Sequence, residues 1–231
     1  MKTQKKLWSA LAALCVATGT VAQPAYNYSK LQKEQLGRGV VAIRENPSDV
    51  VVSWRYLSSD PINTSFNVYR NGEKIAEVPH STGTFYRDTY SGNEKAVYTV
   101  KPVINGVETG KLNGNYTLPA NAPSGYIDIP LDRPAEGVTP SGQKYTYSPN
   151  DASIGDVDGD GEYEIILKWD PSNAHDNAHD GYTGNVYFDC YRLTGEKLWR
   201  IDLGHNVRAG AHYTQSVSYT HLRAHETKAN L

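Results

Sequence analysis

The sequence is poor in cysteine, in positive charge and in long apolar runs, and each scarcity excludes a class of protein. Among its 231 residues the only cysteines are Cys15 and Cys190. Cys15 lies in an N-terminal segment that we expect to be removed, so no intrachain disulfide is expected, and the core or bound metal must hold the fold. The formal net charge of −2 offers no basic surface for a nucleic-acid backbone, so no nucleic-acid partner is expected.

The longest apolar run, residues 7–17, is too short to cross a bilayer. It follows three lysines and precedes the small-x-small sequence Thr20-Val21-Ala22. This pattern predicts a cleaved secretory signal peptide over residues 1–22, and therefore a secreted or periplasmic bacterial protein without a membrane partner after cleavage. An uncleaved anchor remains an alternative, as does a lipoprotein at Cys15, although Leu14 stands where a small residue is wanted.

The other end of the chain reads VSYTHLRAHET over residues 217–227. This string resembles one reading frame of the transposon adapter used in short-read sequencing libraries. We therefore expect residues 216–231 to be an artefact and the natural protein to continue past Gln215. The alternative is a genuine polar tail.

Charge is distributed unevenly over the remaining residues 23–215. Residues 23–125 hold 11 basic and 9 acidic residues, whereas residues 126–215 hold 7 basic and 15 acidic residues. Such asymmetry is typical of two domains. The acidic second half of an exported protein suggests bound cations.

Turn signals separate β-rich runs every eight to twelve residues in the first domain, which we expect over residues 23–117. The clearest runs are residues 50–55 and 65–70. Asn71-Gly72 predicts a tight hairpin after the second run, and Asn105-Gly106 predicts another later in the domain. No helical period is present. The pattern predicts an antiparallel sandwich of the fibronectin-III or immunoglobulin type with Trp54 in its core.

Residues 118–125 have the composition of a linker, and the sequence pattern changes after this segment. Strands are predicted over residues 126–129, 164–169, 184–193 and 197–203, and they alternate with long loops rich in Asp, Asn, Gly and His. The hairpin pattern of residues 194–199, which ends on a tryptophan, is typical of propeller blades. We therefore predict an all-β protein in which a sandwich is followed by the first blades of a truncated β-propeller.

The most specific motif is the D-x-D-G-D-G-x-x-E loop over residues 156–164. Asp156, Asp158 and Asp160 can point inward as the loop curls, Glu162 can add its carbonyl, and Glu164 can close the loop between strands. Oxygen ligands in this arrangement suit Ca²⁺, and so many carboxylates would repel one another without a cation. A solvated acidic turn is the alternative.

Weaker candidates surround this loop. Asn150 and Asp170 each stand where a strand is predicted to meet a loop, a usual place for functional groups. Asp176 and Asp180 belong to a second oxygen-rich loop that could hold another ion. Arg208 could pair with a substrate carboxylate, and His212 lies nearby in sequence. Taken singly, each is also an ordinary turn, surface or structural residue.

Together these motifs resemble a known family. The segments that carry the resemblance are Gly37-Arg38-Gly39-Val40-Val41-Ala42, Val52-Ser53-Trp54-Arg55, Phe66 to Gly72, Asn150-Asp151, the loop 156–164, Lys168-Trp169-Asp170-Pro171 and Arg208-Ala209-Gly210-Ala211-His212. They look like those of the rhamnogalacturonan lyases of polysaccharide lyase family 11, over essentially all of residues 37–215.

The resemblance implies a fibronectin-like domain followed by a calcium-laden, eight-bladed β-propeller. It implies cleavage of the pectin backbone rhamnogalacturonan I by β-elimination, with Asn150 and Asp170 in a calcium and substrate site at the propeller centre. The substrate site would further include Arg208 and His212. The catalytic base is unassigned and expected beyond the truncation, so we expect this chain to be an inactive, monomeric fragment.

Two other functions stay open. One is a non-catalytic, calcium-binding carbohydrate-binding or adhesion protein, because Asp-rich propeller loops also occur there. The other is a related propeller lyase or hydrolase with a different uronate substrate.

Overall fold

The computed structural model of the protein describes residues 35–110, 113–176, 178–210 and 214–216. Within these ranges the regular structure is entirely β, and no helix is long and apolar enough to cross a membrane. The predicted signal peptide, His212 and residues 217–231 lie outside the described residues.

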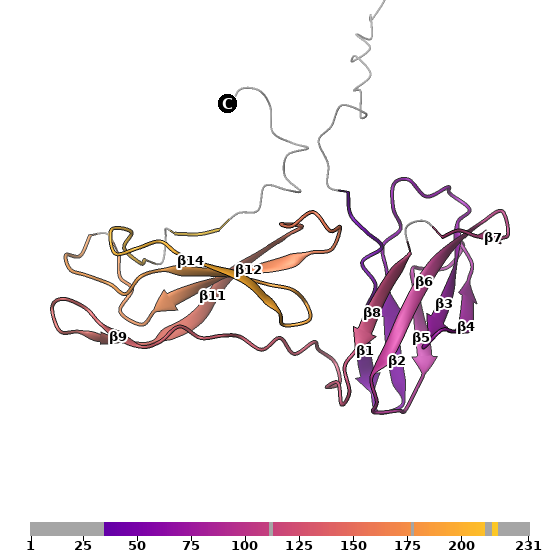
Figure 1. The fold of residues 1–231 in the computed structure, drawn as a ribbon, viewed down its shortest axis with the longest axis horizontal. Coiled ribbons are helices and arrows are strands. Elements are labelled where there is room, and N and C mark those ends of the chain that lie inside the picture. Colours follow the sequence, from indigo (N-terminus) through magenta and orange to yellow (C-terminus); the bar gives the residue numbers. More distant parts are fainter. Residues whose placement is uncertain (1–34, 111–112, 177, 211–213, 217–231) are drawn as a thin grey trace, which may run out of the picture. The chain divides into compact units, whose positions relative to one another are not determined.

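Two antiparallel sheets form the first part of the chain (Figure 1, indigo to magenta). The three-stranded sheet has the order β1-β2-β5, and in the other sheet β6 pairs with β3, β7 and β8 while β4 lies outside β3. The strands are β1 (Val41–Asn46), β2 (Asp49–Ser53), β3 (Ser65–Arg70), β4 (Glu73–Val78), β5 (Phe85–Thr89), β6 (Ala96–Ile104), β7 (Val107–Glu108) and β8 (Gly114–Leu118).

Alternating apolar residues from both sheets build one core. Val50 and Val52 of β2 are completely buried, as is Val68 of β3. Trp54 is 5% exposed and packs edge-on against Phe66, with ring centroids 5.4 Å apart. The predicted sandwich and its core tryptophan are thus confirmed.

Two Asn-Gly turns set the register of the second sheet. Asn71 and Gly72 have φ angles of 50° and 85°, and Asn105 and Gly106 have 51° and 77°. Positive φ at both central residues gives a turn whose twist matches that of the flanking strands. Both predicted hairpins are present, as β3–β4 and β6–β7.

The first domain extends one residue into the predicted linker 118–125. Leu118 ends β8 and is only 2% exposed, because it packs into the sandwich core. Past it, the Gly125 amide donates to the Arg44 carbonyl of β1, so this segment is attached to the sandwich edge.

The second part holds one four-stranded antiparallel sheet in the order β11-β12-β13-β14 and a two-stranded ribbon of β9 and β10 (Figure 1, magenta to yellow). The strands are β9 (Gly137–Val138), β10 (Lys144–Tyr145), β11 (Tyr147–Gly155), β12 (Glu164–Pro171), β13 (Tyr187–Tyr191) and β14 (Lys197–Asp202). The predicted strand at residues 126–129 is absent. Because loops occupy so much of this stretch, it provides one four-stranded sheet where about two blades were predicted.

Both faces of this sheet are apolar. Ile166, Phe188 and Cys190 lie in a cluster on one face, whereas Leu167 and Trp169 lie in a separate cluster. Neighbouring residues of a strand point to opposite faces, so each face needs its own covering layer. This is the hydrophobic pattern of an inner layer rather than of a sheet with one wet face.

Candidate functional site

A β-bulge brings Asn150 and Asp170 together. Pro149 pairs with Trp169 and Ala152 pairs with Leu167, so β11 has one residue more than β12 between these pairs. The extra residue re-aims the side chains at the bulge. The Asn150 amide donates to Asp170 Oδ2 at 2.5 Å, although the two residues are 20 apart in sequence.

Lys168 is a site residue to which the sequence had assigned no role. Its side chain is 1% exposed, and its ammonium lies 3.1 Å from Asp170 Oδ1. Positions 168 and 170 share a face of β12, so strand alternation alone could have linked them. The buried ammonium offsets the charge of Asp170 and fixes the orientation of its carboxylate.

The acidic loop between β11 and β12 is a series of backbone turns closed by its own carboxylates. Gly159 and Gly161 adopt φ angles of 79° and 91°, which favour glycine. Asp156 accepts the Gly159 amide at 2.8 Å and the Gly161 amide at 3.1 Å. Glu164 accepts the Val157 amide at 3.0 Å. The loop therefore holds its carboxylates in place by local hydrogen bonds.

Three of the predicted metal ligands converge. Asp156, Asp158 and Glu164 each offer an oxygen within 4.8 Å of the others. Asp156 and Glu164 are buried, and burial raises the pKa of Glu164, with Asp158 and Asp160 adding to the effect. A divalent cation would reduce the electrostatic repulsion among these carboxylates.

This donor set fits Ca²⁺ by its chemistry. Clustered carboxylates are hard oxygen ligands, and in the described residues the cluster contains no sulfur or imidazole. Asp156, Asp158 and Glu164 would supply the side-chain oxygens. The remaining loop carboxylates lie elsewhere.

Asp160 and Glu162 face other partners. The Arg192 guanidinium ion-pairs with Asp160 at 2.5 Å and also with Asp158, and it holds the pKa of Asp160 below its usual range. The Glu162 side chain turns toward the sandwich, where it accepts the Gly39 amide at 3.2 Å. Only its main-chain carbonyl is left for the role predicted from the loop pattern.

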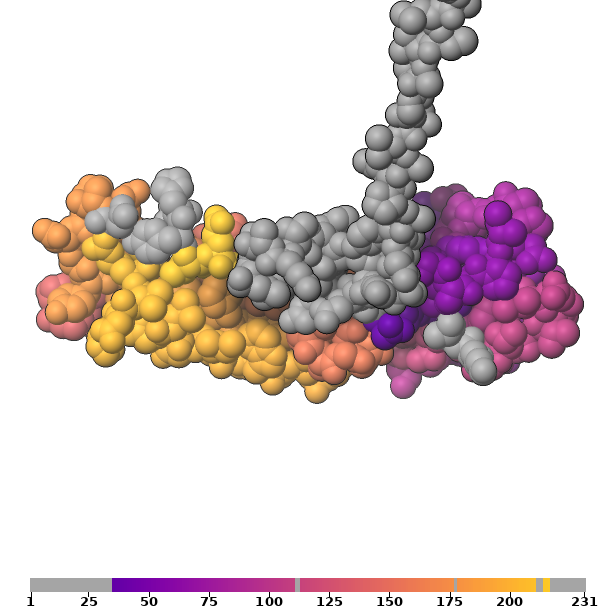
Figure 2. Space-filling model, turned by 90° about the horizontal axis from the view of Figure 1, so that it is seen from above, coloured from indigo at the N-terminus to yellow at the C-terminus, as the bar shows by residue number. Residues whose placement is uncertain are grey.

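The second oxygen-rich loop is placed next to the chain around Arg208. The Arg208 guanidinium donates to the main-chain carbonyls of His179 and Asp176, the latter at 3.3 Å. Figure 2 shows this loop (orange) beside the later residues (yellow) on one side of the molecule. Asp176 and Asp180 are exposed and do not join the carboxylate cluster. Arg208 thus braces the loop, and the role predicted for it toward a substrate carboxylate stays a prediction, as does that of His212.

Two family models match the chain. Residues 31–116 match the β-sheet domain of rhamnogalacturonan I lyases, and residues 126–228 match the C-terminal domain of rhamnogalacturonan lyase family 11. The second match runs into the segment 216–231, whose origin as an adapter stays a prediction.

Similar proteins include two from Bacillus subtilis (strain 168). Rhamnogalacturonan endolyase YesW is 46% identical over 223 residues, which cover 95% of this chain and 34% of YesW. Rhamnogalacturonan exolyase YesX is 50% identical over 190 residues, which cover 82% of this chain and 30% of YesX. The chain therefore spans about a third of the length of these curated relatives.

Solved structures agree with these matches. The crystal structure of YesW superposes with a TM-score of 0.69 at 51% identity, covering 80% of this chain and 30% of that one. The Bacillus licheniformis rhamnogalacturonan lyase PL11 gives 0.67 at 50% identity, with 80% and 31% covered.

Proposed function

Because the chain belongs to rhamnogalacturonan lyase family 11, we propose that it is part of a secreted, calcium-dependent lyase of pectin. The reaction would cleave rhamnose–galacturonate bonds of the rhamnogalacturonan I backbone by β-elimination. The site at Asn150 and Asp170 would bind the galacturonate unit.

The observation that carries this proposal is the pairing of Asn150 with Asp170 across a bulge. A bulge that aims an amide and a carboxylate at one point is a feature typical of functional sites. Lys168 holds the second oxygen of Asp170, so the carboxylate has a fixed orientation toward a ligand.

β-Elimination requires a neutralised uronate carboxylate, a base for the C5 proton and a leaving glycosidic oxygen at C4. A Ca²⁺ ion held by Asn150 and Asp170 would neutralise the substrate carboxylate and acidify the C5 proton. Asp170 and Lys168 form an ion pair, so neither is offered as the base. No water is consumed, so the paired carboxylates of a hydrolase are not required.

The loop 156–164 would hold a second, structural Ca²⁺ through Asp156, Asp158 and Glu164. Asp176 and Asp180 would hold a further ion only after rearrangement, since both are exposed and apart from this cluster. The net acidic second half then matches an acidic polymer through bridging cations.

The four-stranded sheet would be one blade of the eight-bladed propeller. Its two apolar faces support this, because a blade packs against a neighbour on each side. The rest of the propeller and the base would lie in sequence that these 231 residues do not include. The 231-residue chain would then be a secreted or periplasmic monomer without lyase activity.

An assay on rhamnogalacturonan I tests the proposal. Protein expressed from a gene read past codon 215 should release 4,5-unsaturated uronate, detected by its ultraviolet absorbance, and a calcium chelator should stop the release. Asp170→Asn should lower the rate by at least about a hundredfold, because it removes the ligand charge. The 231-residue chain alone should release none.

The outcomes separate the open alternatives. Calcium-dependent binding of the polymer without product, at full length, would favour the carbohydrate-binding protein and contradict the lyase. If product forms only from a different uronate polymer, the related propeller lyase or hydrolase with another substrate is favoured. Clear activity of the 231-residue chain would disprove that it is an inactive fragment.

A further inference from the structure

The far side of the acidic loop is bound to the sandwich by its backbone. The Gly161 carbonyl accepts the Gly37 amide at 2.6 Å and an Arg55 guanidinium N–H at 3.2 Å. The same Arg55 nitrogen donates to the Gly37 carbonyl at 3.2 Å. Arg55 thus bridges the loop and the segment that leads into β1.

The side chains that follow in the loop strengthen this attachment. Glu162 accepts the Gly39 amide at 3.2 Å and lies 3.7 Å from the Arg55 guanidinium. The guanidinium carbon lies 4.6 Å from the centre of the Tyr163 ring, within the range of a cation–π contact. Three consecutive loop residues therefore share one arginine of the sandwich.

Glycines allow this close approach. A Cβ on Gly37 would lie 2.8 Å from Glu162 Oε1, and one on Gly39 would lie 2.5 Å from the Arg55 guanidinium carbon. Gly161 has a φ of +91°, and a Cβ there would lie 2.7 Å from the Gly37 nitrogen. The Gly37-Arg38-Gly39 motif of the sequence thus serves this attachment.

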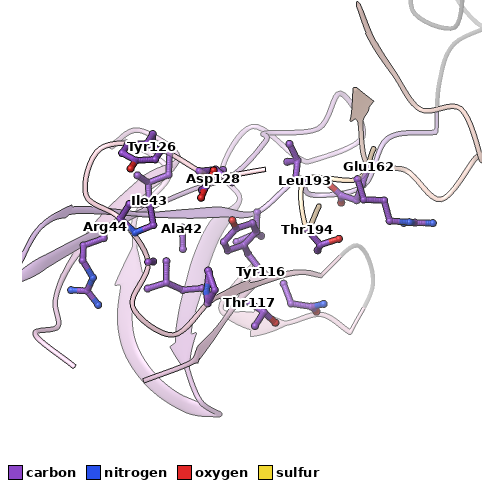
Figure 3. A pocket seen from close by; sticks show the side chains of 18 of the residues that line it. Ala42, Ile43, Arg44, Tyr116, Thr117, Tyr126, Asp128, Glu162, Leu193 and Thr194 are labelled. Atoms are coloured by element: carbon purple, nitrogen blue, oxygen red, sulfur yellow. The ribbon is translucent and has the colours of Figure 1, made fainter. Parts of the chain in front are cut away.

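A cavity of about 470 Å³ lies beside the attachment. Its walls come from β1 and β8 of the sandwich on one side and from Glu162, Leu193 and Thr194 on the other, as Figure 3 shows. Because the two walls leave this space between them, the Arg55 contacts are a local anchor rather than part of a continuous packed interface.

We propose that Arg55 and Glu162 are positioning residues of the calcium loop. This inference rests on the calcium site of the proposed function. Glu162 takes part twice: its amide closes the turn on Asp160 at 2.9 Å, and its side chain binds the sandwich. Anchoring residues 161–163 lowers the entropy that a cation must remove on binding, so the sandwich raises the calcium affinity of the loop. By linkage, the cation strengthens the anchor equally.

Calorimetric titration of the full chain with Ca²⁺ after chelator treatment tests the proposal. Arg55→Ala and Glu162→Ala should each weaken calcium binding on the order of three- to tenfold, about the net effect of one hydrogen bond. Arg87→Ala, which removes an exposed sandwich arginine paired with Glu45, should leave the affinity unchanged.

The sign of the Arg55 effect is diagnostic. Loss of a positive charge near a cation site would by itself tighten calcium binding. Weaker binding by Arg55→Ala therefore supports positioning, whereas tighter or equal binding overturns it. Far-UV circular dichroism checks folding without calcium. If Arg55→Ala does not fold, Arg55→Lys keeps the positive charge but loses the shared guanidinium contacts, so weaker calcium binding by Arg55→Lys supports positioning and equal binding overturns it.

Amide hydrogen exchange gives an independent readout. The Gly37 and Gly39 amides should exchange more slowly with Ca²⁺ than with chelator, and Arg55→Ala should remove most of that difference. If the exchange rates of both amides are the same with and without calcium, the inference is overturned. If the unaltered chain binds no calcium, the calcium site itself is disproved. This outcome differs from a failure of the positioning role, in which the unaltered chain binds calcium and Arg55→Ala does not weaken the binding.

Discussion

At the scale of single residues, acidic side chains with similar sequence surroundings have different roles. Glu164 is 1% exposed inside the carboxylate cluster, whereas Glu162, two positions earlier, binds Gly39. Asp160 is neutralised by Arg192. What separates them is the partner each one meets, and the same reasoning applies to Glu108 in the sandwich.

Glu108 should make the stability of the sandwich depend on pH. Hydrogen bonds from Asn67 at 2.8 Å, Tyr69 at 2.5 Å and Lys101 at 2.9 Å lower its pKa from 4.5 to about 2. A lowered folded-state pKa gives stability that is complete above the unfolded value and is lost as the pH falls toward the folded value. We expect Glu108→Gln to cost roughly 1 kcal/mol at pH 7.

Urea unfolding of both proteins from pH 7 to pH 2.5 checks this. The difference in unfolding free energy should shrink between about pH 4.5 and about pH 2, the window set by the two pKa values. Glu77→Gln is the matched control, because Glu77 is exposed and pairs only with Lys74 among the contacts described for it. A difference that stays constant over this window would contradict the prediction.

At the scale of elements, the four-stranded sheet combines one irregular edge strand with a buried polar centre. β11 contains Pro149 at the edge of the sheet, where a missing amide donor is tolerated. On β13, Asp189 is fully buried and accepts hydrogen bonds from Trp169, Tyr191 and Arg200 at 2.6–2.7 Å. This carboxylate joins β12, β13 and β14.

Asp189→Asn should destabilise the sheet strongly. Burial raises the pKa of Asp189, but the bonds from Arg200, Tyr191 and Trp169 outweigh it and leave the pKa lowered. An amide would remove the nearer counter-charge of Arg200, leaving only Asp132 at 3.9 Å, and would present N–H groups to donors, at a cost of about 3 kcal/mol. Denaturant unfolding measures this cost, and Glu136→Gln, an exposed carboxylate, is the control. A loss below about 1 kcal/mol would show that the network is dispensable.

At the scale of the whole molecule, a cation held by the loop should stabilise the chain. Only the folded chain brings Asp156, Asp158 and Glu164 together, so binding shifts unfolding by mass action. At a hundredfold excess of Ca²⁺ over the dissociation constant, the gain is about 2.7 kcal/mol.

Thermal unfolding with and without Ca²⁺ checks this expectation. The unfolding midpoint should rise with Ca²⁺, and Asp158→Asn should remove the part of the rise that the loop site provides. Asp176→Asn changes an exposed carboxylate outside the cluster and should keep it. A calcium response that follows Asp176 rather than Asp158 would move the site to the second loop.

Features that depend on a few adjacent residues could be predicted from the amino-acid sequence. Asn71-Gly72 and Asn105-Gly106 turn wherever they stand, because their φ preferences are local. Alternation identified the sandwich strands, and the Asp-Gly spacing identified the acidic loop. The strand after this loop, β12, was predicted. Before the loop, a strand was expected to end near Asn150, whereas β11 continues through Asn150 to Gly155.

Contacts between residues far apart in the chain depend instead on how the sheets pair and pack. The bulge that directs Asn150 to Asp170 exists because β11 and β12 pair with one residue in excess. Glu162 resembles a ligand in sequence, yet its side chain bonds to Gly39, 123 positions away. Such contacts follow from the packing of whole sheets, and no local preference encodes them.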